Sequence, residues 1–393
     1  MGILFVRDLI EVKRCNMNSR KKLIRLTTVS RSLSGLLKGQ LAFLSHYYEV
    51  IGVASGEDGL EVVSTREGIR TINVEMHREI SPWNDLQSLW ELIKLFHKER
   101  PYIVHANTPK VSLLSMMAAW ITRVPHRIYT VTGLRFETTS GNFRRLLMAM
   151  ERLTCQMATK VIPEGEGVKK TLLKFNITRK PLKVILNGNI NGVDMDYYSR
   201  YLEIEEKAHR IKNKDFTFIF VGRLVRDKGV NELVRAFVRL LQEKPNVRLL
   251  LVGSLETELD PLEKETQQLM EQCSQIIMPG FQSDVRPFFA ASDALAFPSY
   301  REGFPNVVLQ AGAMGLPSIV TDINGCNEIV KEGVNGKIIP PRDEQALYEA
   351  MKWFYDHQDD EVKKMAENAR PMIAERYEQH KVWEALLKEY QSL

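Results

Sequence analysis

The second half of the chain contains the stretch FTFIFVGRLVRDKG, residues 216–229, and this stretch decides the fold class. Its first six residues, Phe216–Val221, form an apolar and β-branched run that predicts a strand buried on both faces. A glycine follows at once, and a helical pattern occupies Val230–Gln242. A buried strand that leads through a short turn into a helix is the repeating unit of a parallel α/β sheet.

The same alternation of apolar runs and helical patterns extends along the whole chain. Strands are expected over Leu23–Val29, Val50–Val53, Ile103–Ala106, Arg127–Val131, Lys160–Pro163 and Lys183–Leu186, and again over Val247–Val252, Ala294–Phe297 and Ser318–Thr321. Helices are expected over Asp85–Glu99, Phe143–Met157, Asn306–Met314 and within Asp359–Tyr390. Repeated alternation of this kind predicts two α/β blocks with parallel sheets covered by helices on both faces.

The length of 393 residues exceeds one ordinary core and suggests two domains. The polar stretch 187–214 carries two Asn-Gly pairs, so we place the linker there. Residues 1–20 show no clear period, and either Met1 or Met17 is the true start. We therefore predict a leader over 1–20, an N-terminal domain over 21–195, a C-terminal domain over 196–375 and a final helix over 376–393 that packs back on the N-terminal domain.

Charge is unevenly distributed along the chain. Residues 1–200 hold 30 basic and 18 acidic side chains, a net charge of +12, whereas residues 201–393 hold 24 and 31, a net charge of −7. The excess predicts that the first half faces an anionic membrane surface or a pyrophosphate-linked acceptor, with random drift of solvated charge as the alternative. Nucleic acid is not expected, because the basic residues are not interleaved with aromatic ones.

The cysteines and the lengths of the apolar runs indicate where in the cell the protein resides. The four cysteines make no CxxC pair, which favours a reduced cytosolic setting without disulfides or a thiolate metal site. The longest apolar run, Val111–Ile121, is too short to cross a bilayer. The segment Gly141–Leu153 is a basic amphipathic helix, whose apolar stripe is more often part of a core than of a membrane contact. We expect a cytoplasmic protein, peripheral at the inner face of the cell membrane.

The turn after Phe216–Val221 carries the first candidate site. Gly222 lets the backbone approach a ligand closely, and Arg223 and Lys228 place two cations at the end of the strand. The helix that follows points its positive end the same way. Arginine binds phosphate oxygens in a bidentate manner, so the turn is typical of a phosphate site, although a solvated basic loop would have the same composition.

The segment PSYREGFPN, residues 298–306, follows the strand Ala294–Phe297 and carries the second candidate site. Pro305 suits the first turn of a helix, and the backbone N–H groups of Gly303, Phe304 and Asn306 can then cradle a pyrophosphate. Glu302 at the mouth of this turn can accept hydrogen bonds from sugar hydroxyls. The alternative is a carboxylate that merely caps the helix.

At this point the sequence resembles glycosyltransferase family 4. The residues that carry the resemblance are Arg223 and Lys228, EGFPNVVLQ at 302–310, AMGLP at 313–317, Asp322, Gly325 and Glu328, and GVNG at 333–336. The resemblance implies the GT-B fold, in which two Rossmann-like domains with parallel sheets face each other across a cleft that holds a nucleotide-sugar. It also implies transfer with retention of configuration and without a metal, typically in capsule and lipopolysaccharide synthesis or onto lipid-linked acceptors.

The resemblance also implies roles for single residues. Arg223 and Lys228 would hold the diphosphate, and Glu302 would contact the donor sugar. In the first half, Gly35 would belong to a loop near the donor phosphate, and His105 lies in a segment that matches the His-x-His-Thr-Pro-Lys pattern of the family. The expected donor-binding residues are Gly35, Gly222, Arg223, Lys228, Phe281, Glu302, Gly303, Phe304, Pro305, Asn306 and Gln310.

Two positions depart from the family pattern. Gln310 stands where a second glutamate usually holds the ribose, which predicts weaker nucleotide binding because an amide lacks charge assistance. Thr132 stands where many members have a histidine close to the reacting sugar. Thr132 cannot act as an acid or base, so the leaving phosphate would take the acceptor proton in a front-face displacement. His105 is the candidate substitute, with a structural histidine as the commoner alternative.

Other functional classes lack their motifs. A dinucleotide-dependent oxidoreductase needs G-x-G-x-x-G after its first strand, and a P-loop NTPase needs G-x-x-x-x-G-K-[ST], neither of which the sequence supplies. We therefore predict a metal-independent glycosyltransferase whose donor is UDP-linked by analogy with the family. A non-catalytic scaffold that binds nucleotide-sugars and a sugar-nucleotide epimerase are the alternatives. Slow hydrolysis of a nucleotide-sugar would indicate a transferase, binding without turnover a scaffold, and inversion at C2 of the sugar an epimerase.

Overall fold

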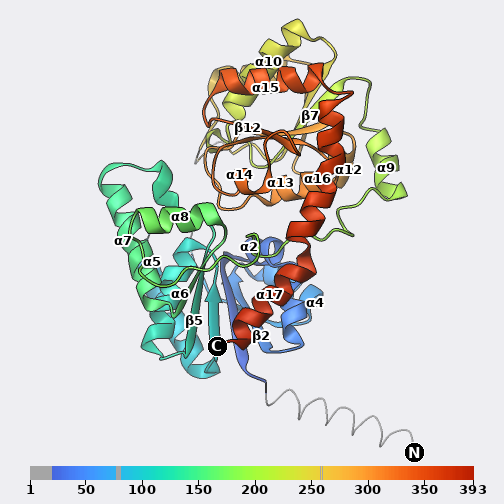
Figure 1. Cartoon of the computed structure of the whole chain (residues 1–393). Helices are drawn as coiled ribbons and strands as arrows, with labels where there is room; N and C mark the ends of the chain where they lie inside the picture. Colours follow the sequence, from blue (N-terminus) through green and yellow to red (C-terminus); the bar gives the residue numbers. More distant parts are fainter. Residues whose placement is uncertain (1–19, 77–80, 257, 259) are drawn as a thin grey trace, which may run out of the picture. The chain divides into compact units, whose positions relative to one another are not determined.

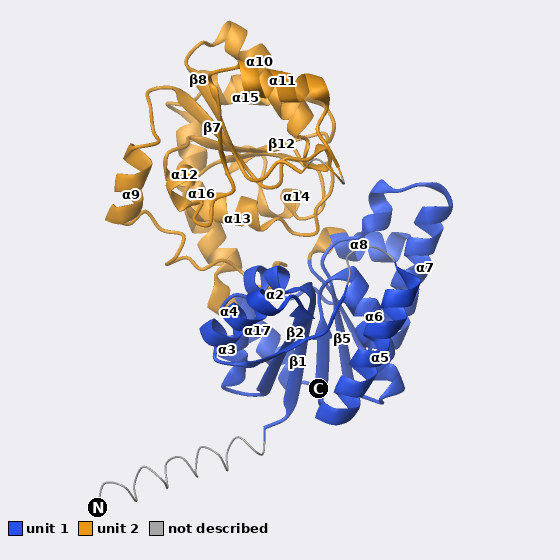
Figure 2. Ribbon diagram, turned by 180° about the vertical axis from the view of Figure 1, so that it is seen from behind, with its two compact units in different colours: residues 1–164, 168–185, 382–393 blue, residues 165–167, 186–381 orange. Residues whose placement is uncertain are grey.

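The structure is a computed structural model, and it describes residues 20–76, 81–256, 258 and 260–393. The leader predicted over residues 1–20 therefore lies outside the described residues except for Arg20. The chain forms two compact units (Figures 1 and 2). Unit 1 comprises the chain up to Glu164, Val168–Ile185 and Val382–Leu393, and unit 2 comprises Gly165–Gly167 and Leu186–Lys381.

Unit 1 contains a parallel six-stranded sheet in the order β3-β2-β1-β4-β5-β6. Its strands are β1 Lys22–Val29, β2 Glu49–Ser55, β3 Arg70–Asn73, β4 Ile103–Ala106, β5 His126–Val131 and β6 Lys160–Pro163. Its helices are α2 Ser30–Leu36, α3 Gln40–Ser45, α4 Glu57–Glu67, α5 Pro82–Glu99, α6 Pro109–Ile121, α7 Gly141–Met157 and, from Val168 onward, α8 Glu166–Lys174. Helices α5, α6 and α7 lie side by side on one face of the sheet, and α2 and α4 lie on the other (Figure 1).

Unit 2 repeats this plan with the order β12-β11-β10-β7-β8-β9, again parallel throughout. Its strands are β7 Phe216–Val221, β8 Val247–Val252, β9 Ile276–Gly280, β10 Ala294–Phe297, β11 Ser318–Thr321 and β12 Gly336–Ile339. Its helices are α9 Leu202–His209, α10 Val230–Glu243, α11 Lys264–Gln272, α12 Arg286–Ala290, α13 Asn306–Ala313, α14 Cys326–Ile329, α15 Glu344–Asp356 and α16 Glu361–Tyr377. Helix α17, Gln379–Gln391, starts in unit 2 and continues into unit 1.

The core of unit 2 is built on the stretch that decided the fold. Phe216, Phe218 and Phe220 of β7 are all buried, and the rings of Phe220 and Phe297 stack at 5.8 Å. Each fully buried phenylalanine contributes about 1.5–3 kcal/mol of hydrophobic free energy. Strand β7 lies between β8 and β10. The chain continues from β7 to β8 and β9 on one side of it and then crosses to β10 on the other side. This is a topological switch point, where α/β sheets place their ligand sites.

Two local predictions were wrong. The strand expected over Lys183–Leu186 is absent, and only an isolated bridge joins Val161 to Leu182. Pro181, which lies just before this segment, has no backbone N–H to donate. Leu186 has a φ of 51°, which a β-strand does not accommodate. Gly35 lies in the last turn of helix α2 and not in a loop, because that helix begins directly after β1.

Candidate active site

The two motifs predicted from sequence meet in unit 2. They follow β7 and β10, which pair in parallel through Leu295 and Ile219, so both turns leave the same edge of the sheet. The backbone N–H of Tyr300 donates to the carbonyl of Asp227 over 2.9 Å, which ties one turn to the other. The sequence order separates the motifs by about seventy residues, yet the parallel pairing makes them neighbours.

Gly229 permits this close approach. Its φ of 71° lies in the left-handed region, and a Cβ atom built on it would lie 2.1 Å from the carbonyl oxygen of Pro298. Any other residue would therefore push the two turns apart. Helix α10 begins at the next residue, Val230, so its N-terminus is held against the second motif.

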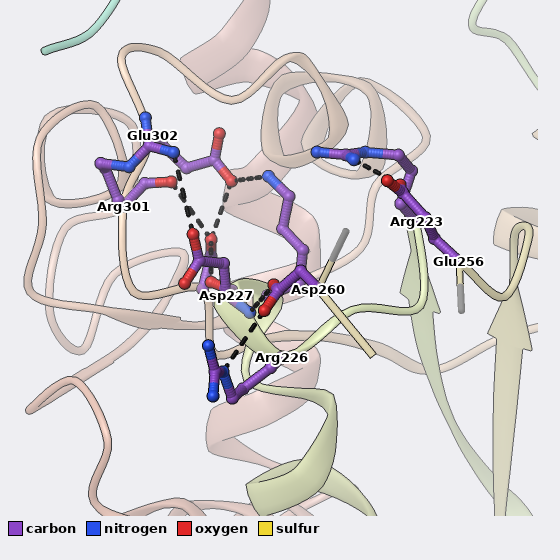
Figure 3. A network of polar contacts seen from close by, with 9 residues as sticks. Arg223, Arg226, Asp227, Glu256, Asp260, Arg301 and Glu302 are labelled. Carbon is purple, nitrogen blue, oxygen red and sulfur yellow. Dashed lines mark hydrogen bonds and ion pairs between the residues drawn. The ribbon is translucent and has the colours of Figure 1, made fainter. Parts of the chain in front are cut away.

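The centre of the site is an ion pair between Lys228 and Glu302, and the latter is labelled in Figure 3. The hydroxyl of Ser299 donates to the same oxygen of Glu302 over 2.8 Å, and the ammonium of Lys228 lies 5.5 Å from the ring of Phe297. Both charged side chains are largely buried, so their interaction is screened less than a surface pair. The carboxylate is thereby fixed in position beside a single cation.

The other cations of the first motif lie at the rim of the site. Arg223 is exposed and pairs with Glu256, which follows β8 (Figure 3). Arg226 pairs with Asp260 at 3.3 Å, and that carboxylate also accepts the backbone N–H of Asp227 at 2.7 Å. The partner of Arg226, Asp260, therefore also holds the backbone of the turn. Arg223 directly follows Gly222 at the end of β7.

The second motif leads into helix α13, which begins at Asn306 after an N-cap at Pro305. The ring of Phe304 is buried 5.5 Å from that of Tyr377, so it anchors the turn. The side-chain oxygen of Asn306 accepts a hydrogen bond from Asn189 over 2.8 Å. Gly303 is buried, and its carbonyl oxygen would lie 2.6 Å from a Cβ atom at Gly325.

The remaining predicted donor residues of unit 2 lie on neighbouring elements. Gln310 is half-buried on α13, one residue after Leu309 in the core. Gly222 has a φ of 155°, and its N–H donates to the carbonyl of Val252 over 3.0 Å. Phe281 is exposed directly after β9. The motif residues 222–229 and 302–306 are therefore brought together, while Phe281 comes from the edge of the sheet.

The predicted residues of the first half lie in unit 1. His105 is buried in β4, where burial and the Arg25 guanidinium hold its pKa well below the usual range. Its two ring nitrogens hydrogen-bond with the hydroxyls of Tyr390 and Thr130. The hydroxyl of Thr132 donates to the carbonyl of Asn107 over 2.8 Å, and Thr132 is partly exposed. Of the two candidates, only Thr132 reaches the surface of its unit.

Three residues of unit 2 had no role in the sequence prediction. Ser299 and Glu256 bind the carboxylate and the guanidinium described above. Glu328 accepts the backbone N–H groups of Glu166 and Gly167, the latter over 2.9 Å. Ser299 lies within the segment 298–306 and Glu328 is one of the residues that carry the family resemblance, so the sequence pointed to both without giving either a role. Glu256 lies in a polar loop, where the sequence does not distinguish a paired carboxylate from a solvated one.

The described part of the chain shows neither a cluster of metal ligands nor a helix that could cross a membrane. Within residues 20–76, 81–256, 258 and 260–393, no group of three or more His, Cys, Asp and Glu side chains is arranged to hold a metal ion. In the same part of the chain, no helix has the length and apolar character that a membrane crossing requires.

Two family models and a curated relative match most of the chain. Residues 203–372 match the family model described as glycosyl transferases group 1, and residues 34–188 match a glycosyl transferase 4-like domain. The chain is 33% identical to the capsular polysaccharide biosynthesis glycosyltransferase CapM of Staphylococcus aureus over 94% of this chain and 97% of that protein.

Two further similarities concern lipid-linked acceptors and the fold. The chain is 30% identical to an Escherichia coli UDP-Gal:alpha-D-GlcNAc-diphosphoundecaprenol alpha-1,3-galactosyltransferase over 75% of this chain and 76% of that enzyme. The structure of Anabaena HepE in complex with UDP-glucose superposes with a TM-score of 0.79 at 20% identity, over 95% of this chain and 100% of that one. This superposition shows that the two proteins share a fold.

Proposed function

The chain belongs to the group 1 glycosyltransferases and has the GT-B fold, and from this premise we propose that it transfers a sugar from a UDP-sugar to a lipid-diphosphate-linked glycan with retention of configuration. The ion pair of Lys228 and Glu302 at the switch point of unit 2 carries the proposal. It supplies a cation for a diphosphate and a carboxylate for sugar hydroxyls at one place. The name of the Staphylococcus aureus relative refers to capsular polysaccharide, and the biosynthesis of capsule or lipopolysaccharide is the context that we propose for this chain.

The proposed reaction needs no side-chain base. The acceptor hydroxyl oxygen bonds to the anomeric carbon while the bond from that carbon to the diphosphate oxygen breaks, on the same face of the sugar. The departing diphosphate takes the proton of the acceptor hydroxyl, so UDP leaves with it. Negative charge on the diphosphate grows as the bond breaks, and Arg223 and Lys228 stabilise it there.

We also propose that these two cations replace the divalent metal that other nucleotide-sugar enzymes use. Arg223 and Lys228 belong to one turn and lie seven and two residues before Val230, where α10 begins. The N-terminus of that helix therefore adds a third positive element. Turnover of a UDP-sugar at full rate in the presence of a strong chelator supports this, and a rate that returns only on adding Mg²⁺ or Mn²⁺ contradicts it.

The partner that we propose for unit 1 is an anionic membrane surface, where a lipid-linked acceptor resides. The apolar stripe of α7 is only partly a core stripe, because Leu147 is buried while Phe143 and Leu146 are exposed. Arg152 donates to backbone carbonyls at the end of α8, whereas Arg145 is exposed. The net charge of +12 over residues 1–200 favours an anionic surface.

The proposed function is tested with a panel of nucleotide-sugars. The protein is first screened by thermal shift, because a ligand at a hundred times its dissociation constant stabilises by about 2.7 kcal/mol. The donor that binds is then incubated with and without an undecaprenyl-diphosphate-linked sugar. Slow hydrolysis alone and fast transfer with the acceptor support a transferase. Binding without turnover would assign a scaffold, and inversion at C2 an epimerase.

A further inference from the structure

Helix α5 of unit 1 is apolar on two opposite sides. Its inward side is buried in the core through Leu92 and Phe96. Its outward side carries Trp83, Leu86 and Trp90, which are 83%, 58% and 57% exposed. Spacings of three and four residues place these side chains above one another on one side of a helix. Two tryptophans and a leucine aligned on the solvent side of a helix form an exposed apolar patch that marks an interaction surface.

The basic side chains of α5 gather on its outward side, and of its acidic side chains only the half-buried Glu91 lies between the two ends of the helix. Exposed basic side chains continue the outward side toward the C-terminus of the helix, namely Lys94, His97 and Lys98. The acidic residues at its two ends are engaged elsewhere. Asp85 pairs with Lys110 at 2.6 Å, and Glu99 is buried and pairs with Arg70 at 2.6 Å. The ammonium of Lys94 lies 5.4 Å from the ring of Trp90, so the cationic part adjoins the aromatic part.

We propose that α5 is the lipid-binding element of unit 1, and that Trp83, Leu86 and Trp90 insert into the headgroup region of an anionic bilayer. Tryptophan is enriched at this depth of a bilayer because its ring is apolar and its N–H is polar. The basic residues behind the aromatic ones would then meet lipid phosphates, and the net charge of +12 over residues 1–200 attracts such a surface. This inference rests on the proposed function, in which the acceptor is lipid-linked.

A second helix offers a contact at the same end of unit 1. Helices α5 and α7 flank α6 and precede parallel strands, so their N-terminal halves lie at the same end of the sheet (Figure 2). Phe143 and Leu146 are the exposed apolar residues in that half of α7. Trp120, which is 57% exposed, lies in the last turn of α6 and therefore at the opposite end of the sheet. An exposed tryptophan of matched accessibility is thus available as a control.

The experiment compares the wild type, W83Q/W90Q and W120Q in the full chain. Each is sedimented with vesicles of phosphatidylcholine, with or without phosphatidylglycerol, at low and high salt. We expect the wild type to bind anionic vesicles with a blue shift of its tryptophan emission, and to keep part of this binding at high salt. W83Q/W90Q should bind at least about tenfold more weakly at high salt and lose the blue shift. W120Q should behave as the wild type.

Three outcomes overturn the proposal. They are a wild type that binds no anionic vesicles, a W83Q/W90Q protein that binds as the wild type does, and equal losses in W83Q/W90Q and W120Q. Sedimentation without lipid adds a fourth, because a wild-type dimer that W83Q/W90Q converts to a monomer would assign the patch to a second copy of the chain. Hydrolysis of the donor separates this test from the proposed function. W83Q/W90Q should hydrolyse a UDP-sugar normally and lose transfer only to an acceptor embedded in vesicles.

Discussion

Lys228 and Glu302 leave neighbouring strands of unit 2 and form a largely buried ion pair, in which Ser299 also donates to the carboxylate. A pair of this kind holds both groups in place before a substrate arrives. Preorganised charges stabilise a transition state without the cost of reorienting at the moment of reaction. The pair therefore connects the geometry of the switch point to the chemistry of a departing diphosphate.

Replacing Lys228 with alanine should lower kcat about a hundredfold or more, by analogy with the loss of one oxyanion donor. The effect on KM should be smaller, because the diphosphate gains charge only as the glycosidic bond breaks. Arg223→Ala should act in the same direction. Steady-state kinetics with the identified donor provides the measurement.

Arg226→Ala is the matched control for these two variants. Arg226 belongs to the same turn, carries the same charge and is exposed and paired as Arg223 is, but its partner Asp260 also holds the backbone of the turn through Asp227. Its removal should change kcat by a few-fold at most, as expected for an exposed ion pair. Equal losses in all three variants would indicate a collapsed turn, and near-normal kcat in Lys228→Ala and Arg223→Ala would refute their assignment.

Gln310→Glu should tighten the binding of UDP by about 1–2 kcal/mol, the difference between a neutral and a charge-assisted hydrogen bond. Gln310 lies half-buried on α13, about one turn into the helix that the second motif leads into. Calorimetry with UDP measures the change, and Gln310→Met shows the cost of losing the amide. An affinity that neither substitution alters would make Gln310 a packing residue.

The sequence predicted the central strands and one edge strand, β6, but missed the other three edge strands. Strands β3, β9 and β12 lie at sheet edges, and β3 reads Arg-Thr-Ile-Asn without a continuous apolar run. A central parallel strand is buried on both faces and must be apolar, whereas an edge strand is partly solvated and need not be. Both motifs of the candidate site follow central strands. The sequence therefore predicted that the two motifs lie next to each other. It did not predict that Arg223 pairs with Glu256, because Glu256 lies in a polar loop.

The buried carboxyl of Glu151 in unit 1 should make stability depend on pH. Burial raises its pKa from 4.5 to about 7, and the Tyr129 hydroxyl, which donates to it over 2.9 Å, partly opposes the shift. The folded state therefore binds this proton more tightly than the unfolded state. The stabilisation is complete below the unfolded pKa of 4.5 and is lost as pH rises through about 7, at a cost of about 3 kcal/mol.

Glu151→Gln should remove this dependence while keeping an acceptor for the Tyr129 hydroxyl. The free energy of unfolding, measured with denaturant from pH 5 to pH 8, should fall more steeply in the wild type than in the variant. The two proteins should therefore differ most at the alkaline end. Parallel curves would mean that Glu151 is not the group that titrates.

We expect His105 to be a structural residue of unit 1. It should not replace Thr132, which cannot itself act as a base, in the reaction. Its pKa is held well below the usual range by burial and by Arg25, and both of its ring nitrogens bond to hydroxyls. It therefore stays neutral at physiological pH and offers no nitrogen to an acceptor. His105→Gln should cost about 1–3 kcal/mol of stability through unpaired buried groups, with kcat within a few-fold of the wild type.

Tyr390→Phe tests the same network from helix α17. The Tyr390 hydroxyl accepts a hydrogen bond from the buried Arg25 guanidinium over 2.8 Å and also bonds to His105. Its removal should lower stability as His105→Gln does, and the double variant should lose less than the sum, because both changes break one network. Denaturant unfolding and transfer kinetics on the same preparations separate the two roles. A hundredfold loss of kcat in His105→Gln at unchanged stability would instead make His105 a catalytic residue, and the pH profile of kcat would then have to show its titration.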